Sequence, residues 1–511
     1  MNTRKVSSSF ISLRQFAFLC LGSFLVFPLN AQAQPESSLI FDAVRIEYID
    51  ADPETTADFR VRELSALPSR VNNVQPFIED FLTDSEALTE SPVLYQESIL
   101  QFEMDGGPYD PRLSEAYLSL GQVYQQLDDQ ELAIEALSNA LHVNRINNGL
   151  FNATQLNIVS ELVESYLRHG DFAAANQQQE YLFFIQQKIY GPNNPVILSS
   201  LLEYADWNLH ASSLSLGYIP DTEALGLRLL PQVTDSFIRN LRNFDNQPLI
   251  QLNLASNAYK QALRLQRRHE AIAPNLDPDR LRRIETDLQL SESNLNILET
   301  EKKLAFTHLL LGNMLENYPT TASNAQADFY FRTLREGQDA LQRRLDYLRN
   351  ANSTELDIGM ALVDMADWFL LTERWSSAEQ MYIQAYQFMD ANQLEHIPGL
   401  SYPDLPVPIP SYVSPFYSRA SNNISADAVL DYEGYIDVSF ELSRLGNASD
   451  IEILSYTENT QDDTLRALRR MLRRTQFRLQ LQDNEQYAEN SYLVRYYYTP
   501  QPALETQSED E

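Results

Sequence analysis

The side chains that most often carry catalysis or hold metal ions are present in this sequence but form no recognisable site. No two of the six histidines have the spacing of metal ligands, and we expect each at a turn or on the surface. They are His142, His169, His210, His269, His308 and His396. We find no glycine-rich phosphate loop, no Gly-x-Ser-x-Gly and no Cys-His pair, and the 71 carboxylates are too many for one acid–base pair to be singled out. We therefore predict no enzyme activity and no catalytic, cofactor-binding or metal-binding residues.

One group of charged residues has a regular spacing. Arginines near the C-terminus follow the spacing i, i+3, i+4, i+7 and i+8, which places them on one face of a helix: Arg466, Arg469, Arg470, Arg473 and Arg474. Leu465, Leu468 and Leu472 form the opposite stripe. In a chain of net charge −33 this face is a local reversal of sign. It is either a docking face for an acidic partner or for the chain's own acidic segment 501–511, or an ordinary solvated face.

Residues 1–33 have the features of an export signal. Basic residues come first, an apolar run covers 16–29, and Ala31-Gln32-Ala33 is a small-x-small cleavage sequence. The run is shorter than the roughly 20 residues that span a bilayer. We expect cleavage after Ala33 and a periplasmic protein of a Gram-negative-type envelope. The alternative is a retained membrane anchor.

The charge and the single cysteine bound the classes of partner. Removing the signal with its cations Arg4, Lys5 and Arg14 changes the net charge from −33 to −36, since −33 − 3 = −36. Such a charge argues against nucleic acid and against anionic membrane surfaces as partners. Cys20 leaves with the signal, so the exported chain has no thiol for disulfides or metal sites. We expect proteins or peptides of the cell envelope as partners.

A repeat organises the first half of the chain. Gly107, Gly149 and Gly191 are each 42 residues apart (149 − 107 = 42; 191 − 149 = 42), and each follows a helical pattern. Between the first two glycines, small and large apolar residues recur in two amphipathic helices joined by a turn at 128–129. They are Tyr117, Leu120, Gly121, Tyr124, Ala133, Leu137 and Ala140. This spacing resembles the tetratricopeptide repeat (TPR), and a similar unit begins at Leu362.

The repeat-like pattern predicts a mostly α-helical protein. We expect an N-terminal segment at 34–74 and a TPR-like helical solenoid over 75–395. The sequence does not decide whether residues 220–300 continue the solenoid, although Asp277-Pro278 predicts the start of a long helix through Leu298. The proline-rich segment 396–420 is expected as a stiff linker. The alternative is an ordered strap lying on the solenoid.

Residues 421–500 have a different period. Apolar and polar residues alternate over 435–442, 450–454 and 492–498, and a helical pattern covers 462–475, so a small β-β-α-β domain is expected. Its order and the residues Gly434-Tyr435-Ile436-Asp437-Val438 and Gly446-Asn447 resemble the TonB C-terminal domain. The family's proline after the helix is absent from Phe477-Arg478-Leu479. Residues 501–511 are expected to be an acidic, disordered tail.

The last strand is the second candidate surface. An exposed edge can accept a partner's extended segment, and the resemblance implies this use. The aromatic anchors would be Tyr492, Tyr496, Tyr497 and Tyr498; the alternative is that they pack on the helix at 462–475. Together these features predict a periplasmic scaffold whose solenoid binds one partner and whose TonB-like domain engages a second. The alternative is an energy transducer or accessory of TonB-dependent outer-membrane transport.

Overall fold

The computed structural model describes most of the chain, and Leu39–Pro500 form one compact unit. The described residues are 39–49, 60–63, 85–215, 219–220, 248–287, 290–317, 324–351, 353–389, 391–394, 397–401, 405–410, 413–414, 434–443, 445–458, 460–482, 485–486 and 491–500. The expected export signal and the segment 501–511 therefore lie outside them. No helix in these ranges is both long and apolar enough to cross a membrane.

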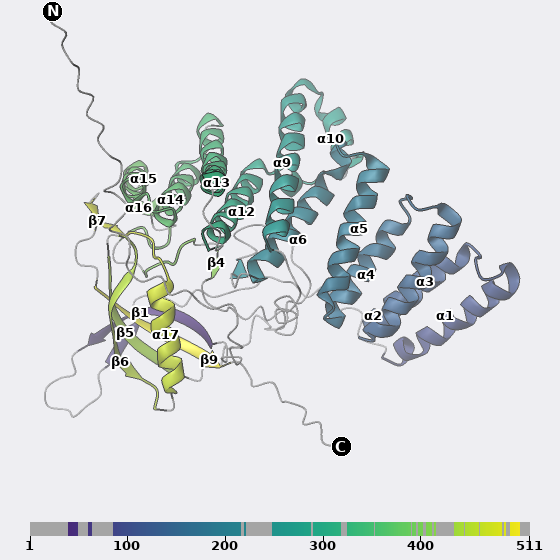
Figure 1. Cartoon of the computed structure of the whole chain (residues 1–511), viewed down its shortest axis with the longest axis horizontal. Coiled ribbons are helices and arrows are strands. Elements are labelled where there is room, and N and C mark those ends of the chain that lie inside the picture. Colours follow the sequence, from purple (N-terminus) through teal and green to yellow (C-terminus); the bar gives the residue numbers. More distant parts are fainter. Residues whose placement is uncertain are drawn as a thin grey trace, which may run out of the picture. The chain divides into compact units, whose positions relative to one another are not determined.

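Helices packed side by side form the N-terminal part of the helical stack (Figure 1). They are α1 (Ser85–Gly106), α2 (Arg112–Gln126), α3 (Gln130–Asn148), α4 (Gln155–His169) and α5 (Phe172–Tyr190). Helices α2 and α3 form one hairpin and α4 and α5 the next. The predicted turn between α2 and α3 is present, and the Asp129 carboxylate accepts a hydrogen bond of 3.2 Å from the Leu132 N–H to cap α3.

The glycines that mark the repeat adopt one geometry. Gly107, Gly149 and Gly191 have φ of +82°, +81° and +84°, a conformation that side chains disfavour. The N–H of each glycine donates to the carbonyl four residues earlier, at distances of 2.9, 3.0 and 3.0 Å. The predicted 42-residue repeat is therefore confirmed at the level of the turns that end α1, α3 and α5.

Close approach within a hairpin depends on the small residue of its first helix. A Cβ atom added to Gly121 would lie 2.6 Å from Cγ of Leu137 on α3. Leu137 is fully buried, as are Ala133 and Ala140 on the same helix. These are the positions that the TPR-like spacing predicted to fill the hairpin core.

The helix stack continues through the middle of the chain. Helix α6 (Leu198–Ser215) packs on α9 (Pro248–Ile272), which packs on α12 (Ile297–Asn317). The long helix expected from Asp277 to Leu298 is wrong: α10 (Pro278–Asp287) ends early, and the short α11 (Glu292–Leu295) intervenes. The Asp277 carboxylate accepts from the Arg280 N–H at 3.3 Å, so the predicted start of that helix is correct.

The last helices are followed by a packed strap. These helices are α13 (Asn324–Asn350), α14 (Glu355–Leu371), α15 (Trp375–Phe388) and the short α16 (Ala391–Leu394). Ile397, Leu400 and Ile409 of the proline-rich segment are buried in the same apolar cluster as α14 and α15. The Ile409 N–H donates to the Gln476 carbonyl at 2.8 Å. The described part of this segment is therefore packed, as in the strap alternative, rather than a free linker.

The C-terminal sheet has more strands than the sequence predicted. Its order is β2-β1-β9-β5-β6, and its neighbouring strands are antiparallel. The strands are β1 (Leu39–Ile49), β2 (Arg60–Glu63), β5 (Gly434–Leu442), β6 (Ala448–Tyr456) and β9 (Ser491–Pro500). The expected β-β-α-β elements are β5, β6, α17 (Asp462–Arg474) and β9, and α17 covers one face of the sheet (Figure 1). Strands β1 and β2 come from residues 34–74, where we expected only an N-terminal segment. Short pairs β3 (Ile219–Pro220) with β4 (Val413–Ser414) and β7 (Leu481–Gln482) with β8 (Glu485–Gln486) complete the strands of the described ranges.

We predict that Leu137→Ala destabilises the first hairpin by about 2–5 kcal/mol, because it leaves a cavity opposite Gly121. Leu132→Ala on the same helix is the matched control, since Leu132 is 39% exposed, and it should cost less than about 0.5 kcal/mol. Urea unfolding followed by circular dichroism measures both. Equal losses for the two variants would contradict the assigned packing.

Candidate functional site

Helix α17 presents the predicted arginine face to solvent. Leu468 and Leu472 are fully buried against β5 and β9, and this burial fixes which side of the helix faces outward. All of the arginines on the other side are exposed: Arg466, Arg469, Arg470, Arg473 and Arg474. Arg466 forms an ion pair with Asp463 in the first turn. The structure therefore brings the predicted arginines together on one accessible surface.

The predicted edge at the last strand is wrong. Strand β9 pairs with β5 on one side and with β1 on the other, where Leu39–Arg45 lie opposite Val494–Pro500. The edges of the sheet are β2 and β6. Tyr492, Tyr496 and Tyr498 are buried at 2%, 2% and 5% exposure in the core beneath α17, so the alternative of packing on the helix holds for them. Tyr497 is half-buried on the opposite face.

That opposite face carries a charged pair that the sequence analysis missed. Asp437 of β5 lies directly across from Arg495 of β9, and the guanidinium donates from Nε at 2.7 Å and from Nη2 at 3.0 Å. The Ser455 hydroxyl donates to the same carboxylate at 2.6 Å. The guanidinium carbon lies 4.0 Å from the centre of the Tyr435 ring. The pair could have been found only from the register of β5 against β9, because directly opposite residues on one face interact.

A buried ion pair links the C-terminal module to the last helical hairpin. Arg478 follows α17 and donates to Asp367 of α14 from Nε at 3.1 Å and from Nη2 at 2.6 Å. The Tyr382 hydroxyl of α15 donates to the same carboxylate at 2.6 Å, and Arg478 Nη1 donates to the Pro398 carbonyl at 2.6 Å. Arg478 thus stands beside the position where the TonB-like pattern lacked its proline, and it contacts both the hairpin and the strap.

Burial and the charge of Asp367 shift the pKa values of both groups that donate to it. Burial acts to lower the pKa of Arg478, but the adjacent Asp367 charge and hydrogen bonds outweigh it and raise that pKa above its ordinary value. Burial, followed by the charge of Asp367, raises the pKa of Tyr382 well above its ordinary value. At neutral pH the Arg478 guanidinium therefore stays charged, and the Tyr382 hydroxyl keeps the proton that it donates.

One partly buried arrangement has the residue types of a catalytic triad but not its geometry. Ser256 Oγ lies 3.2 Å from Nε2 of His308, and Glu336 Oε2 lies 3.4 Å from the same nitrogen. In a working triad the acid binds the other ring nitrogen. His308 Nδ1 has no hydrogen-bond partner among the described residues, and Ser256 is only 3% exposed. The arrangement is thus a packed polar contact between α9, α12 and α13.

The histidines and tryptophans differ in part from expectation. His210 and His308 are buried in helices at 3% exposure, whereas we expected turn or surface positions. Burial lowers the pKa of His210 to about 4. Trp207 and Trp368 are buried, at 5% and 2% exposure, whereas Trp375 is 45% exposed. In the part of the chain that the structure describes, no group of three or more His, Cys, Asp or Glu residues is arranged to hold a metal ion.

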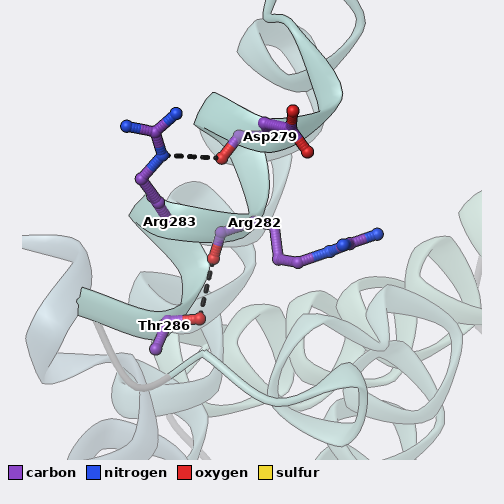
Figure 2. Close-up of a pocket in the computed structure, with 4 residues that line it drawn as sticks. All are labelled: Asp279, Arg282, Arg283 and Thr286. Atoms are coloured by element: carbon purple, nitrogen blue, oxygen red, sulfur yellow. Dashed lines mark hydrogen bonds between the residues drawn. The ribbon is translucent and has the colours of Figure 1, made fainter.

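A hollow on α10 offers no enclosed binding site. It is lined by Asp279, Arg282, Arg283 and Thr286, and all four lie on one helix (Figure 2). Arg283 Nε donates to the Asp279 carbonyl at 3.3 Å, and the Thr286 hydroxyl donates to the Arg282 carbonyl at 2.8 Å (Figure 2). These two side chains therefore bond to the backbone of their own helix.

Comparison with known proteins finds a likeness of fold only. No family model and no curated protein sequence matches the chain. Two solved structures of a Podospora anserina putative kinesin light chain with nearly identical TPR-like repeats are similar, at 15% identity and a TM-score of 0.30. The match to one of them, a point variant, covers 56% of this chain and 97% of the other, and the match to the second covers 54% and 95%. The TPR-like assignment stands on the chain's own repeated hairpins.

We predict that Arg478→Gln and Asp367→Asn each destabilise the chain by about 3–5 kcal/mol, because each leaves a buried charge without its partner. The double variant should lose clearly less than the sum of the two. Thermal and urea unfolding of the wild type, the two single variants and the double variant measure this coupling. Arg466→Gln, at an exposed ion pair, is the control and should change little. Additive losses would show that the pair does not interact.

We predict that acid weakens the fold through His210. An unfolded histidine has a pKa of about 6.5, whereas that of His210 is about 4, so only the unfolded chain takes up the proton between these values. The contribution of His210 to stability should therefore be full above about pH 6.5 and fall by about 1.4 kcal/mol per unit towards pH 4. His210→Asn should show a shallower slope of unfolding free energy against pH. If His210→Asn keeps the wild-type slope, His210 does not cause the loss of stability.

Proposed function

We propose that this chain is a periplasmic protein-interaction scaffold in which the helical stack binds one partner and the C-terminal α+β module engages a second envelope protein. Stacked helix pairs bury one face and leave the other as an extended surface for a partner. The periplasmic location rests on the sequence features of residues 1–33.

The observation that carries the proposal is that the two parts present surfaces of opposite charge. Residues 85–190, which span α1–α5, contain 15 acidic and 4 basic residues, so their net charge is 4 − 15 = −11. Helix α17 has five arginines and two aspartates, a net charge of 5 − 2 = +3, and its arginines are exposed. Complementary charge selects partners and rejects like-charged ones, so the two surfaces suit different proteins.

The test is a pull-down from envelope extract with full-length baits. The variant carries Arg469→Glu and Arg473→Glu, and we expect it to lose one subset of the wild-type partners and to retain the rest. Arg282→Glu with Arg283→Glu on α10 is the control, because it reverses the same number of exposed charges elsewhere. Identical partner sets for all three baits would show that the arginine face binds nothing and that the two-surface proposal is wrong.

The order of β5, β6, α17 and β9 favours a second candidate function, a role in TonB-dependent outer-membrane transport. The pairing of β1 with β9 argues against it, because the edge on which strand addition would occur is already occupied. Fractionation distinguishes the candidates: an N-terminus retained in the membrane supports transduction, and a freely soluble chain beginning near residue 34 supports the scaffold.

A further inference from the structure

A row of exposed apolar side chains crosses the first repeats. It contains Leu100, Met104, Tyr109, Ile146, Phe151 and Phe184, which we call the apolar ladder. Their exposed fractions run from 44% to 82%, so none of them belongs to the core. Single exposed apolar residues are ordinary, but several that recur at matching positions of a repeat make a candidate binding surface.

The ladder follows the repeat. Leu100 of α1 and Phe184 of α5 occupy one position of the 42-residue unit, since 100 + 42 + 42 = 184, and the residue between them is His142. Met104 and Ile146 share a second position, since 104 + 42 = 146, and Tyr109 and Phe151 share a third, since 109 + 42 = 151. At the second and third positions, neighbouring repeats therefore place exposed apolar side chains at equivalent places, and at the first position such side chains lie two repeats apart.

Ring contacts join the rungs. The centre of the Tyr109 ring lies 6.2 Å from that of His142, and the centre of Phe151 lies 6.0 Å from that of Phe184. The second pair is the first displaced by one repeat. Each pair holds a loop residue against the following helix hairpin, so the aromatic faces are fixed before any partner arrives. Aromatic side chains such as Tyr and Phe are enriched at protein interfaces.

The surroundings of the ladder indicate the occupant. Exposed carboxylates flank it at Glu97, Asp105 and Glu180, within the segment whose net charge is −11. The Lys188 ammonium lies 5.3 Å from the centre of the Phe184 ring, so one cation stands beside the ladder against these carboxylates. On α1 the ladder residues are four apart, which forms the ridge against which a second helix packs. We infer that the ladder binds a cationic amphipathic helix of a partner protein, which rests on the proposed function and deepens it by naming the partner of the helical stack. A second copy of this chain would bring the same excess of carboxylates and be repelled.

The experiment measures binding of a synthetic probe to the full-length chain at about 0.15 M salt, where exposed charges more than about 8 Å apart are largely screened. The probe is a fluorescent Leu/Lys amphipathic helix of about five turns, and a Leu/Glu helix of the same length is its charge-reversed match. Phe151→Ala with Phe184→Ala should weaken binding of the Leu/Lys helix by about tenfold or more. Phe331→Ala on α13 is the control, because Phe331 is 64% exposed and outside the ladder. It should leave the affinity unchanged, and the Leu/Glu helix should not bind.

Three outcomes would overturn the inference. Equal affinity of the wild type and the double variant would show that the general negative charge, and not the ladder, holds the probe. Equal weakening by Phe331→Ala would show that the effect is not local. Self-association of the wild type that is lost in the double variant, measured by sedimentation velocity, would make a second copy the occupant. None of these results alters the pull-down, which tests the arginine face, so the two proposals fail independently.

Discussion

Each helix pair in this chain has an apolar face that only its neighbour can bury, and the described structure depends on this constraint. Leu137 of α3 and Leu162 of α4 share one buried cluster, so each hairpin is completed by the next. At the C-terminal end of the stack the chain supplies its own cover, since Leu400 of the strap and Leu481 after α17 join the cluster of the last helices. At the other end α1 keeps apolar residues such as Met104 exposed, so apolar surface remains uncovered on the first repeats.

Apolar cover alone does not fix the position of what covers it, because such contacts are non-directional. The C-terminal module has a directional contact as well. The planar fork of Arg478 matches the carboxylate of Asp367 at two points, and the hydroxyl of Tyr382 occupies a further lone pair. Arg478 points towards α14, and its ion pair with Asp367 therefore fixes one orientation of the module on the helices.

The sequence predicted the features that local periodicity encodes and missed those that join distant segments. The spacing of Leu120, Gly121 and Leu137 predicted the hairpins, and the arginine spacing predicted the exposed face of α17. The edge assigned to β9 was wrong because its partner β1 comes from the opposite end of the described chain. The pairs Asp437–Arg495 and Asp367–Arg478 leave no trace in a single segment, since their members are far apart in sequence.

The two candidate surfaces require partners of opposite charge, and this difference distinguishes them more clearly than their positions do. A cationic helix that fits the apolar ladder is attracted by the carboxylates around it and repelled by the arginines of α17. An acidic partner of α17 is repelled by the first repeats in the same way. Discrimination by an unfavourable contact at the wrong site needs no tight fit at the right one. The five arginines of α17 repel a cationic partner of the helical stack. They therefore restrict that partner to the stack even if they bind nothing themselves.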